Sequence, residues 1–373
     1  MDEKKVVLYQ KPHINLAWST AGRMWLVSLC AGLAIFQSSV TDAFASLIIA
    51  ITVMAAAIIT EFLIYFRTEK AGMVKDGSAI TSALLLALLL PNQIHPLYAA
   101  LGAVFAMTVV KHSFGGLGAN WMNPAVGGWL FIRFSWPAAF NNAIATAPVA
   151  MLQERLERDG SNFPDLTKGF TQGSPLEILK VSGISDFPVG GSPFDNTVAT
   201  WLNKTIFSIT GSELPGGYID LLTATTAGII ADRGLLALLL GTIIIVAFQV
   251  TRSWVPAVYL GMYGLLIRIF GALPFGGALG AGDILFGFFS GGTMVAAFLL
   301  VTDPATGPKS KIGTLITAFL AACFTYIFRY QGSEVYGAFF AVALMNVLVP
   351  LIRDIESRRL YVAVEPAKGG IDG

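Results

Sequence analysis

Three threonines, Thr223, Thr225 and Thr226, follow Asp220 in the stretch GYIDLLTATTA, just before a long apolar run. Aspartate and threonine often cap helices by accepting hydrogen bonds from free backbone N–H groups. The same N–H groups and hydroxyls would also suit a phosphate or the edge of a flavin. From these residues alone a helix start is the favoured interpretation, and phosphate or flavin binding is the alternative.

A second hydroxyl-rich turn, DGSAITSA, begins at Asp76 and includes Ser82. It shares with the stretch from Asp220 an acidic residue, two hydroxyls five and six positions later, and then an alanine. A leucine-rich block follows each stretch. We therefore predict an internal repeat that relates 76–83 to 220–227.

Two further groups of polar residues stand beside prolines that break apolar segments, Asn123 before Pro124 and Thr302-Asp303 before Pro304. A carboxylate at the end of an apolar span is either an interfacial cap or a functional group, and both interpretations stay open for Asp303. Asn123 opens a short segment of the kind found in channel half-helices and in broken transporter spans.

Hydrolytic, nucleotide and metal chemistry find little support. The sequence has no G-x-S-x-G, H-E-x-x-H or P-loop pattern, and its glycine-rich stretch 271–283 is not flanked by a strand and a helix. Cys30 and Cys323 stand alone in apolar runs, and no two of the three histidines have ligand spacing. We expect no metal site, and the net charge of +1 argues against a nucleic-acid partner.

The elements that must position these residues are membrane spans. Of the 373 residues 55% are hydrophobic and only 13% charged, with a mean hydropathy of +0.68, whereas a soluble domain carries about 25% charged residues. Apolar runs of spanning length occur at 23–39, 43–66, 96–114, 234–251, 253–271, 284–302, 311–330 and 334–353. Two shorter runs, 79–90 and 124–136, end at prolines. Together they predict an all-α polytopic membrane protein with ten segments, five on each side of a polar insert.

The predicted organisation has five parts: a cytoplasmic N-terminal segment 1–22, a first membrane repeat 23–137, an extracytoplasmic insert 138–220, a second repeat 221–353 and a cytoplasmic tail 354–373. Fifteen of the 24 Lys and Arg residues fall at the ends assigned to the inside, which places both termini in the cytoplasm. Because each half has an odd number of spans, the repeat must be inverted, and such repeats usually bind their ligand at the interface between them.

Five stretches, in order along the chain, resemble one family of membrane proteins: KPHINLAWST, DGSAITSALLLALLLP, GGLGANWMNPAVGGWLF, SGGTMVAAFLLVTDPATGP and EVYGAFFAVALMNVLVPLI. The family comprises the D subunit of the Rnf complex and its paralogue, the B subunit of the sodium-pumping NADH:quinone oxidoreductase. The short N-terminus favours the Rnf branch. The resemblance implies a bundle of ten transmembrane helices in two inverted five-helix repeats, similar to urea channels.

The resemblance also implies a cofactor. Members carry FMN esterified through its phosphate to the last threonine of an Asp-Gly-x-Ser/Thr-Gly-Ala-Thr motif. On this sequence the motif falls on 220–226, so the implied acceptor is Thr226. Leu221, Ala224 and Thr225 depart from the motif, and Thr223 and Thr225 therefore remain alternative acceptors.

A second flavin, the non-covalent riboflavin of the paralogous family, is hypothesised near Asp76 and Ser82. Asn123, Thr302 and Asp303 complete the candidate cofactor-binding residues. Asp303 is also the carboxylate that we would test first for ion coupling.

The implied function is that of a membrane electron-transfer subunit between ferredoxin and NAD, in a complex that moves Na⁺ or H⁺ across the cytoplasmic membrane. No turnover is expected from this chain alone. Its expected partners are the other subunits of the complex, one of which carries a second covalent FMN, together with a flavin transferase and the lipid bilayer. The alternatives are the quinone-reductase paralogue and a redox-silent transporter of the urea-channel type.

Overall fold

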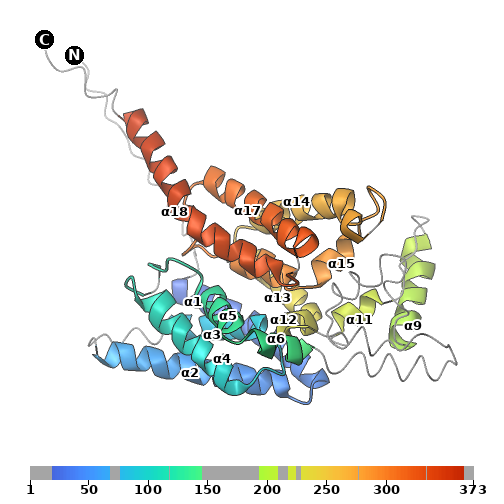
Figure 1. Ribbon diagram of the computed structural model, residues 1–373, viewed down its shortest axis with the longest axis horizontal. Coiled ribbons are helices and arrows are strands. Elements are labelled where there is room, and N and C mark those ends of the chain that lie inside the picture. The colour runs from blue at the N-terminus through green and yellow to red at the C-terminus, as the bar shows by residue number, and fades with distance from the viewer. Residues whose placement is uncertain are drawn as a thin grey trace, which may run out of the picture.

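The computed structural model describes residues 19–67, 76–116, 118–144, 193–208, 217–223, 228–275, 277–332 and 334–364, and every regular element within them is helical (Figure 1). The first half contains α1 (Thr20–Thr41), α2 (Ala45–Arg67), α3 (Ser78–Leu89), α4 (Pro96–Phe105), the π-helical turn η2 (Ala106–His112), α5 (Pro124–Ser135) and α6 (Pro137–Ile144). The region predicted as the insert, 138–220, includes nearly all of α6 and contributes α9 (Pro193–Leu202), η5 (Asn203–Phe207) and the start of α11 (Tyr218–Leu222).

The second half contains α12 (Ile230–Arg233), α13 (Leu235–Ala247), α14 (Trp254–Phe270), η6 (Leu273–Phe275), α15 (Ile284–Phe289), α16 (Thr293–Val295), η7 (Ala296–Leu300), α17 (Lys311–Tyr326), η8 (Ile327–Gln331) and α18 (Gly337–Val364). Helix α18 continues through part of the segment predicted as the tail.

Length and composition confirm a polytopic membrane protein. Among the described residues, five helices are long and apolar enough to cross a bilayer: Thr20–Thr41, Ala45–Arg67, Trp254–Phe275, Lys311–Gln331 and Gly337–Arg358. Three shorter apolar helices lie at Ser78–Leu89, Pro96–His112 and Leu235–Ala247. The count of ten crossing segments and the domain boundaries remain predictions.

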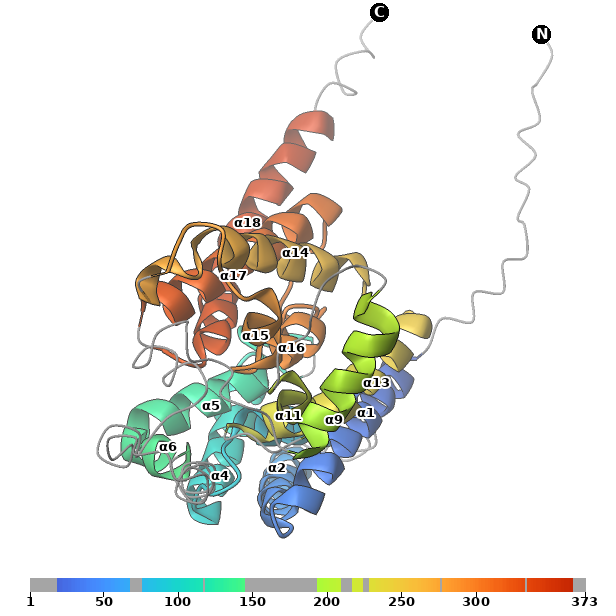
Figure 2. The ribbon, with the colours of Figure 1, turned by 90° about the vertical axis from the view of Figure 1, so that its right-hand side faces the viewer.

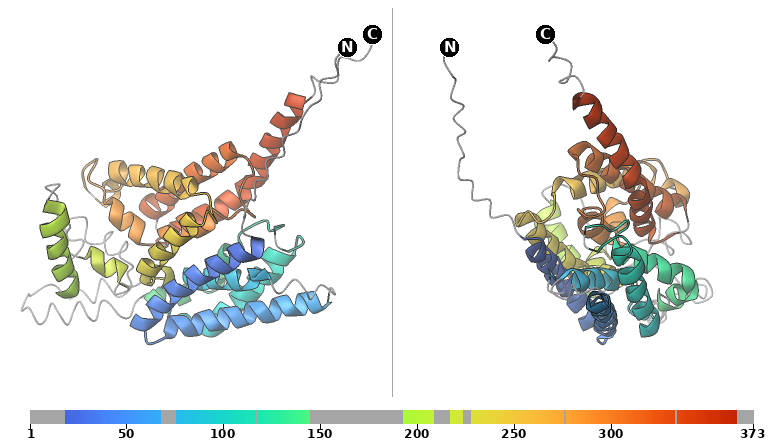
Figure 3. Two further views of the ribbon diagram at one scale, coloured as in Figure 1. Left: turned by 180° about the vertical axis from the view of Figure 1, so that it is seen from behind. Right: turned by 90° about the vertical axis from the view of Figure 1, so that its left-hand side faces the viewer.

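The helices form two groups that meet face to face (Figures 1 and 2). Helices α1 to α5 make one group, with α13 packed along α1, and α14, α17 and α18 make the other. The view from behind shows α1 and α2 side by side below the second group (Figure 3). The leucine-rich second half of α3 runs through the interior, where Leu86, Leu88 and Leu89 are fully buried.

Small residues allow the close helix crossings. A Cβ on Gly234 would lie 2.1 Å from the carbonyl oxygen of Ala34, and a Cβ on Gly128 would lie 2.8 Å from that of Gly102. Any larger residue at these positions would force the backbones apart. Glycines at these positions therefore serve packing between helices.

The predicted continuous span 284–302 is wrong, because the chain breaks at Ser290-Gly291-Gly292 between α15 and α16. Gly291 and Gly292 have φ of 64° and 69°, a left-handed conformation that favours glycine. A matching break precedes α3, where Gly77 has a φ of 77°. Gly217, at the start of α11, is likewise left-handed, with a φ of 104°, and the repeat that relates 76–83 to 220–227 stays a prediction.

Candidate functional site

A cavity of about 320 Å³ lies where the start of α1, the start of α3, the start of α5 and the end of η7 meet. Its lining residues are Thr20, Arg23, Met24, Val27, Ser78, Thr81, Ser82, Leu85, Lys111, Asn120, Asn123, Pro124, Val250, Thr251, Phe298, Leu299, Thr302, Asp303, Pro304 and Ala305. The cavity thus draws residues from both halves of the chain.

Four residues singled out from the sequence line this cavity: Ser82, Asn123, Thr302 and Asp303. Asp76 is not among the lining residues of the cavity. It lies beside one of them, because its Oδ1 accepts a hydrogen bond of 2.8 Å from the N–H of Ser78 at the start of α3. Tertiary structure has brought together polar residues that occur in three separate stretches of the sequence.

Asn123 and Asp303 join the two halves at this point. The Nδ2 of Asn123 donates to Oδ2 of Asp303 at 3.0 Å, while its Oδ1 accepts from the N–H of Ala125 and caps α5. Asp303 also accepts from the N–H of Ala305 at 3.0 Å and from the hydroxyl of Thr306 at 3.2 Å. The carboxylate is therefore held in one orientation at the cavity wall.

Several polar atoms in the cavity wall are buried, and the described part of the chain supplies no hydrogen-bond partner for them. They are Nε of Arg23, Oδ1 of Asn120 and Oγ1 of Thr251. Leaving buried polar atoms without partners costs about 1–3 kcal/mol each. Residues that line the cavity therefore carry both donors and acceptors that a bound molecule or water can pair with.

A buried ion pair lies against the same cavity. Lys111 and Glu61 have side chains only 1% and 0% exposed, and Nζ of Lys111 lies 2.5 Å from Oε1 of Glu61. Nζ also donates to the hydroxyl of Ser78 at 2.7 Å. His112 approaches Glu61 at 3.6 Å and packs edge-on against Tyr65. The π-helical turn η2 brings both Lys111 and His112 toward α2, and such wide turns are common at functional sites.

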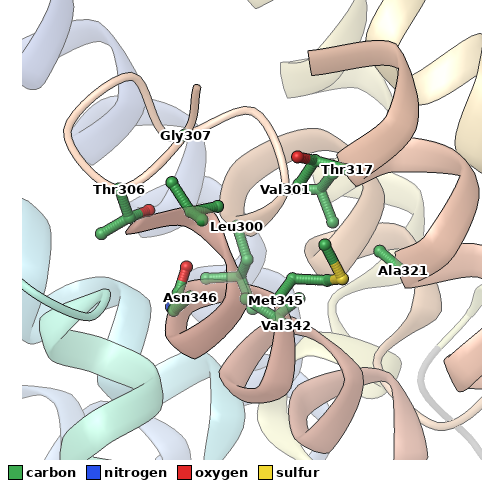
Figure 4. A pocket seen from close by; sticks show the side chains of 10 residues that line it. Leu300, Val301, Thr306, Gly307, Thr317, Ala321, Val342, Met345 and Asn346 are labelled. Atoms are coloured by element: carbon green, nitrogen blue, oxygen red, sulfur yellow. The ribbon is translucent and has the colours of Figure 1, made fainter. Parts of the chain in front are cut away.

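A much smaller cavity lies next to the turn that follows Asp303 (Figure 4). Thr306 and Asn346 contribute polar groups to its wall, and Leu300 and Met345 contribute apolar ones. Its volume of about 10 Å³ matches at most a single water molecule. The larger cavity is therefore the candidate ligand site.

Comparison with known proteins identifies the family. The model of the NQR2, RnfD, RnfE family matches residues 7–361, nearly the whole chain. The chain belongs to this family. The resemblance seen in five separate stretches of the sequence is thereby confirmed.

Relatives within the NQR2, RnfD, RnfE family align along almost their full length. The D subunit of the proton-translocating ferredoxin:NAD(+) oxidoreductase complex of Clostridium ljungdahlii is 29% identical over 91% of both chains. The D subunit of the Na(+)-translocating complex of Acetobacterium woodii is 30% identical over 97% of this chain and 96% of its own. The D subunit of the ion-translocating oxidoreductase complex of Shewanella denitrificans is 29% identical over 94% and 96%.

This family member has a second buried charged cluster, at the break before α16. The fully buried guanidinium of Arg329 donates to the hydroxyls of Tyr263, Thr293 and Ser290 and to the carbonyl of Gly287, at 2.6–2.8 Å. Asp232 accepts from the N–H groups of Gly291 and Gly292 at 2.9 and 2.8 Å. Arg329, from η8, thus donates to a hydroxyl at the start of α16. In the same way Lys111, from η2, donates to a hydroxyl at the start of α3.

The segment that resembles the flavin-attachment motif of the NQR2, RnfD, RnfE family begins in α11. Asp195 of α9 accepts hydrogen bonds from the N–H groups of Gly217, Ile219 and Asp220 at 2.6, 2.8 and 3.1 Å. The Tyr218 hydroxyl donates to Asp283. Gln37 of α1 donates to the carbonyl of Leu222 at 2.9 Å.

Three other parts of the chain thus hold this five-residue helix. The helix itself carries two of the predicted residues, Asp220 and, at its end, Thr223. Thr225 and Thr226 lie outside the described residues.

Five residues described above were not among the candidates from sequence: Glu61, Lys111, Arg329, Asp232 and Asp195. A signal was present for the first three, because ionisable residues inside apolar segments usually face the protein interior and are often functional. Asp232 stands just before the predicted span 234–251. Lys111 lies in the predicted span 96–114 and is one of the fifteen Lys and Arg residues counted at the inside ends, although it is buried. Asp195 gave no such signal, since an aspartate in a polar stretch is ordinarily exposed.

Proposed function

We propose that this chain is the D subunit of an Rnf complex, the membrane electron-transfer subunit of an ion-translocating ferredoxin:NAD oxidoreductase. Its similarity to proteins of that name over 91% or more of its length carries the proposal. One of these relatives is named for protons and another for Na⁺, so either ion fits this chain. In this proposal the protein lies in a prokaryotic cytoplasmic membrane among the other Rnf subunits, one of which carries a second covalent FMN.

Covalent FMN on Thr226, attached by a flavin transferase, is the first cofactor of the proposal. The hydroxyl of Thr223 is already engaged, since it donates to the carbonyl of Ile219 at 3.0 Å, and this favours Thr225 or Thr226 as the acceptor. A phosphoester would tether the ribityl-phosphate end and leave the ring accessible. When bound, the flavin supplies the electron-transfer chemistry, and the protein supplies its position and electrostatic surroundings.

A non-covalent riboflavin in the 320 Å³ cavity is the second cofactor. The volume falls within the range of about 300–1,000 Å³ typical of small-molecule sites. Arg23 offers a donor, Asn120 an acceptor and Thr251 a hydroxyl, all without partners in the described part of the chain. These atoms suit the imide edge of a flavin, which presents both N–H and C=O groups. Asn123, Ser82 and Thr302 would hold the same ring.

The proposed topology has ten crossing segments in two inverted halves, similar to urea channels, with both termini in the cytoplasm. The starts of α3 and α16 support this topology because they are alike. Each helix begins after a left-handed glycine. At each start a hydroxyl also accepts a hydrogen bond from a cation that belongs to a π-helical turn. In this topology the cavity faces the cytoplasm and Thr226 faces the outside. Electrons would then cross the membrane between the two flavins, and Asp303 is the carboxylate to test for ion coupling.

The decisive experiment measures flavin fluorescence of the denatured protein in a gel, after co-expression with a flavin transferase. Wild type should give a fluorescent band, and Thr226→Val should give a dark one. A band that stays bright in Thr226→Val would move the acceptor to Thr225 or Thr223 and leave the redox function intact. A dark wild-type band would contradict the covalent flavin and favour the redox-silent transporter. Quinone reduction by the purified complex would favour the paralogous sodium-pumping enzyme.

A further inference from the structure

Lys111 has one hydrogen-bond donor to spare beside the cavity. An ammonium group carries three N–H donors. Glu61 and Ser78 take one each, at 2.5 and 2.7 Å. Lys111 also lines the 320 Å³ cavity, so the third N–H is available to whatever occupies it.

The buried ammonium of Lys111 is both paired and hydrogen-bonded. A buried charge without a partner is strongly unfavourable, whereas a paired and hydrogen-bonded charge is tolerated. Glu61, itself fully buried, supplies the opposite charge from α2, and Ser78 supplies a hydroxyl from the start of α3. The ammonium of Lys111 is therefore held in position by groups of the protein itself.

The other charged residues of the cavity wall are Arg23 and Asp303. Asp303 is oriented by Asn123, Ala305 and Thr306, whereas Nε of Arg23 has no partner in the described part of the chain. With Glu61 paired to Lys111, two cations and two carboxylates lie at this wall, so its charges balance. Lys111 and Arg23 still offer N–H donors without partners in the described part of the chain, and these favour a ligand whose acceptor atoms gain negative charge.

We propose that Lys111 recognises the reduced form of the redox cofactor in this cavity and thereby raises its reduction potential. The ligand class is an aromatic heterocycle of the flavin type, whose carbonyl and ring-nitrogen acceptors gain negative charge on reduction. A fixed cation in a dry site stabilises such charge more strongly than water does. The proposal rests on the second flavin of the proposed function and assigns the group that sets its potential.

The test compares Lys111→Met with the double variant Glu61→Gln/Lys111→Met and with Lys111→Arg. The single variant leaves Glu61 buried without its counter-ion, while the double variant removes both charges and protects the fold. Thr108→Ala is the matched control, because Thr108 lies in the same turn η2 but is exposed and bonded to the carbonyl of Val104. The readouts are non-covalent flavin per polypeptide in the purified complex and the midpoint potential of that flavin by spectroelectrochemical titration.

Loss of one charge-assisted hydrogen bond should weaken binding of the reduced flavin, relative to the oxidised flavin, by about tenfold. For a two-electron couple, tenfold corresponds to a fall of about 30 mV in midpoint potential. The double variant should show this fall, Lys111→Arg should recover most of it, and Thr108→Ala should match wild type.

An unchanged potential in a flavin-loaded double variant would overturn the role of Lys111 and leave the second flavin in place. Wild-type protein that carries covalent FMN but no non-covalent flavin would overturn both. Loss of bound flavin from the double variant but not from Lys111→Arg would support recognition by the cation.

Discussion

The amide of Asn123 donates to the carboxylate of Asp303 across 180 positions of sequence, at 3.0 Å. One residue caps α5 in the first half, and the other begins the turn that follows η7 in the second. Each residue stands directly before a proline that fixes the backbone beside it. This hydrogen bond therefore closes the ligand cavity from both halves of the chain.

Asn123→Ala should reduce non-covalent flavin in the purified complex, because Asp303 loses its partner from the first half. It should also destabilise the protein by about 1 kcal/mol through loss of the α5 cap. His95→Ala is the matched control, since His95 likewise caps a helix that starts with proline but is exposed and does not line the cavity. Equal flavin loss in both variants would contradict a specific role for Asn123.

Thr223→Val should keep the full covalent flavin signal. Its hydroxyl is bonded to the carbonyl of Ile219 within α11 and is not needed as an acceptor in the proposal. Gel fluorescence against Thr226→Val distinguishes the two positions directly. A dark Thr223→Val band beside a bright Thr226→Val band would reverse the assignment.

Asp195→Ala should open the start of α11, because three backbone N–H groups lose one shared acceptor. Caps of this kind contribute about 0.5–2 kcal/mol, so amide exchange at residues 217–220 should accelerate about tenfold. The rate of covalent flavin attachment should fall in parallel. Lys204→Ala, on the exposed face of the neighbouring turn η5, should leave both unchanged. Normal attachment despite faster exchange would show that α11 need not be held for the transferase.

Arg329→Met should be among the most destabilising single substitutions in the chain. It leaves Asp232 buried without the nearby cation and four acceptors without their donor. Removing one partner of a buried ion pair lowers the free energy of unfolding by about 3–5 kcal/mol. The double variant Asp232→Asn/Arg329→Met should recover part of that loss in thermal unfolding in detergent. Additive losses would mean that the two residues are not coupled.

The stability of α11 should decrease at high pH because of Tyr218. Burial and the hydrogen bond to Asp283 raise the pKa of the Tyr218 phenol well above its usual range. Above about pH 10 the unfolded chain loses this proton while the folded chain keeps it, so folding weakens as pH rises. Tyr218→Phe should remove this part of the pH dependence in amide exchange of 217–223. A wild-type profile identical to that of Tyr218→Phe would count against it.

The membrane character and most helix boundaries followed from sequence, because apolar runs and prolines act locally. The runs 43–66, 96–114 and 311–330 became helices within a few residues of the expected limits. The sequence did not predict the break inside the run 284–302, because the residues around it are apolar or small. The left-handed backbone of Gly291 and Gly292 is selected only by the packing around them.

For the candidate site, too, the sequence predicted some features and the tertiary structure decided others. The polar residues beside prolines, Asn123 and Asp303, stood out in the sequence because polar groups within apolar surroundings need a reason. Their meeting in one cavity, and the pairing of Lys111 with Glu61, depend on contacts between segments far apart in the chain. Residue type and local order determined which groups could do chemistry here. Which of them share a cavity was decided only by tertiary packing, because burial and hydrogen bonding across helices are set by the whole fold.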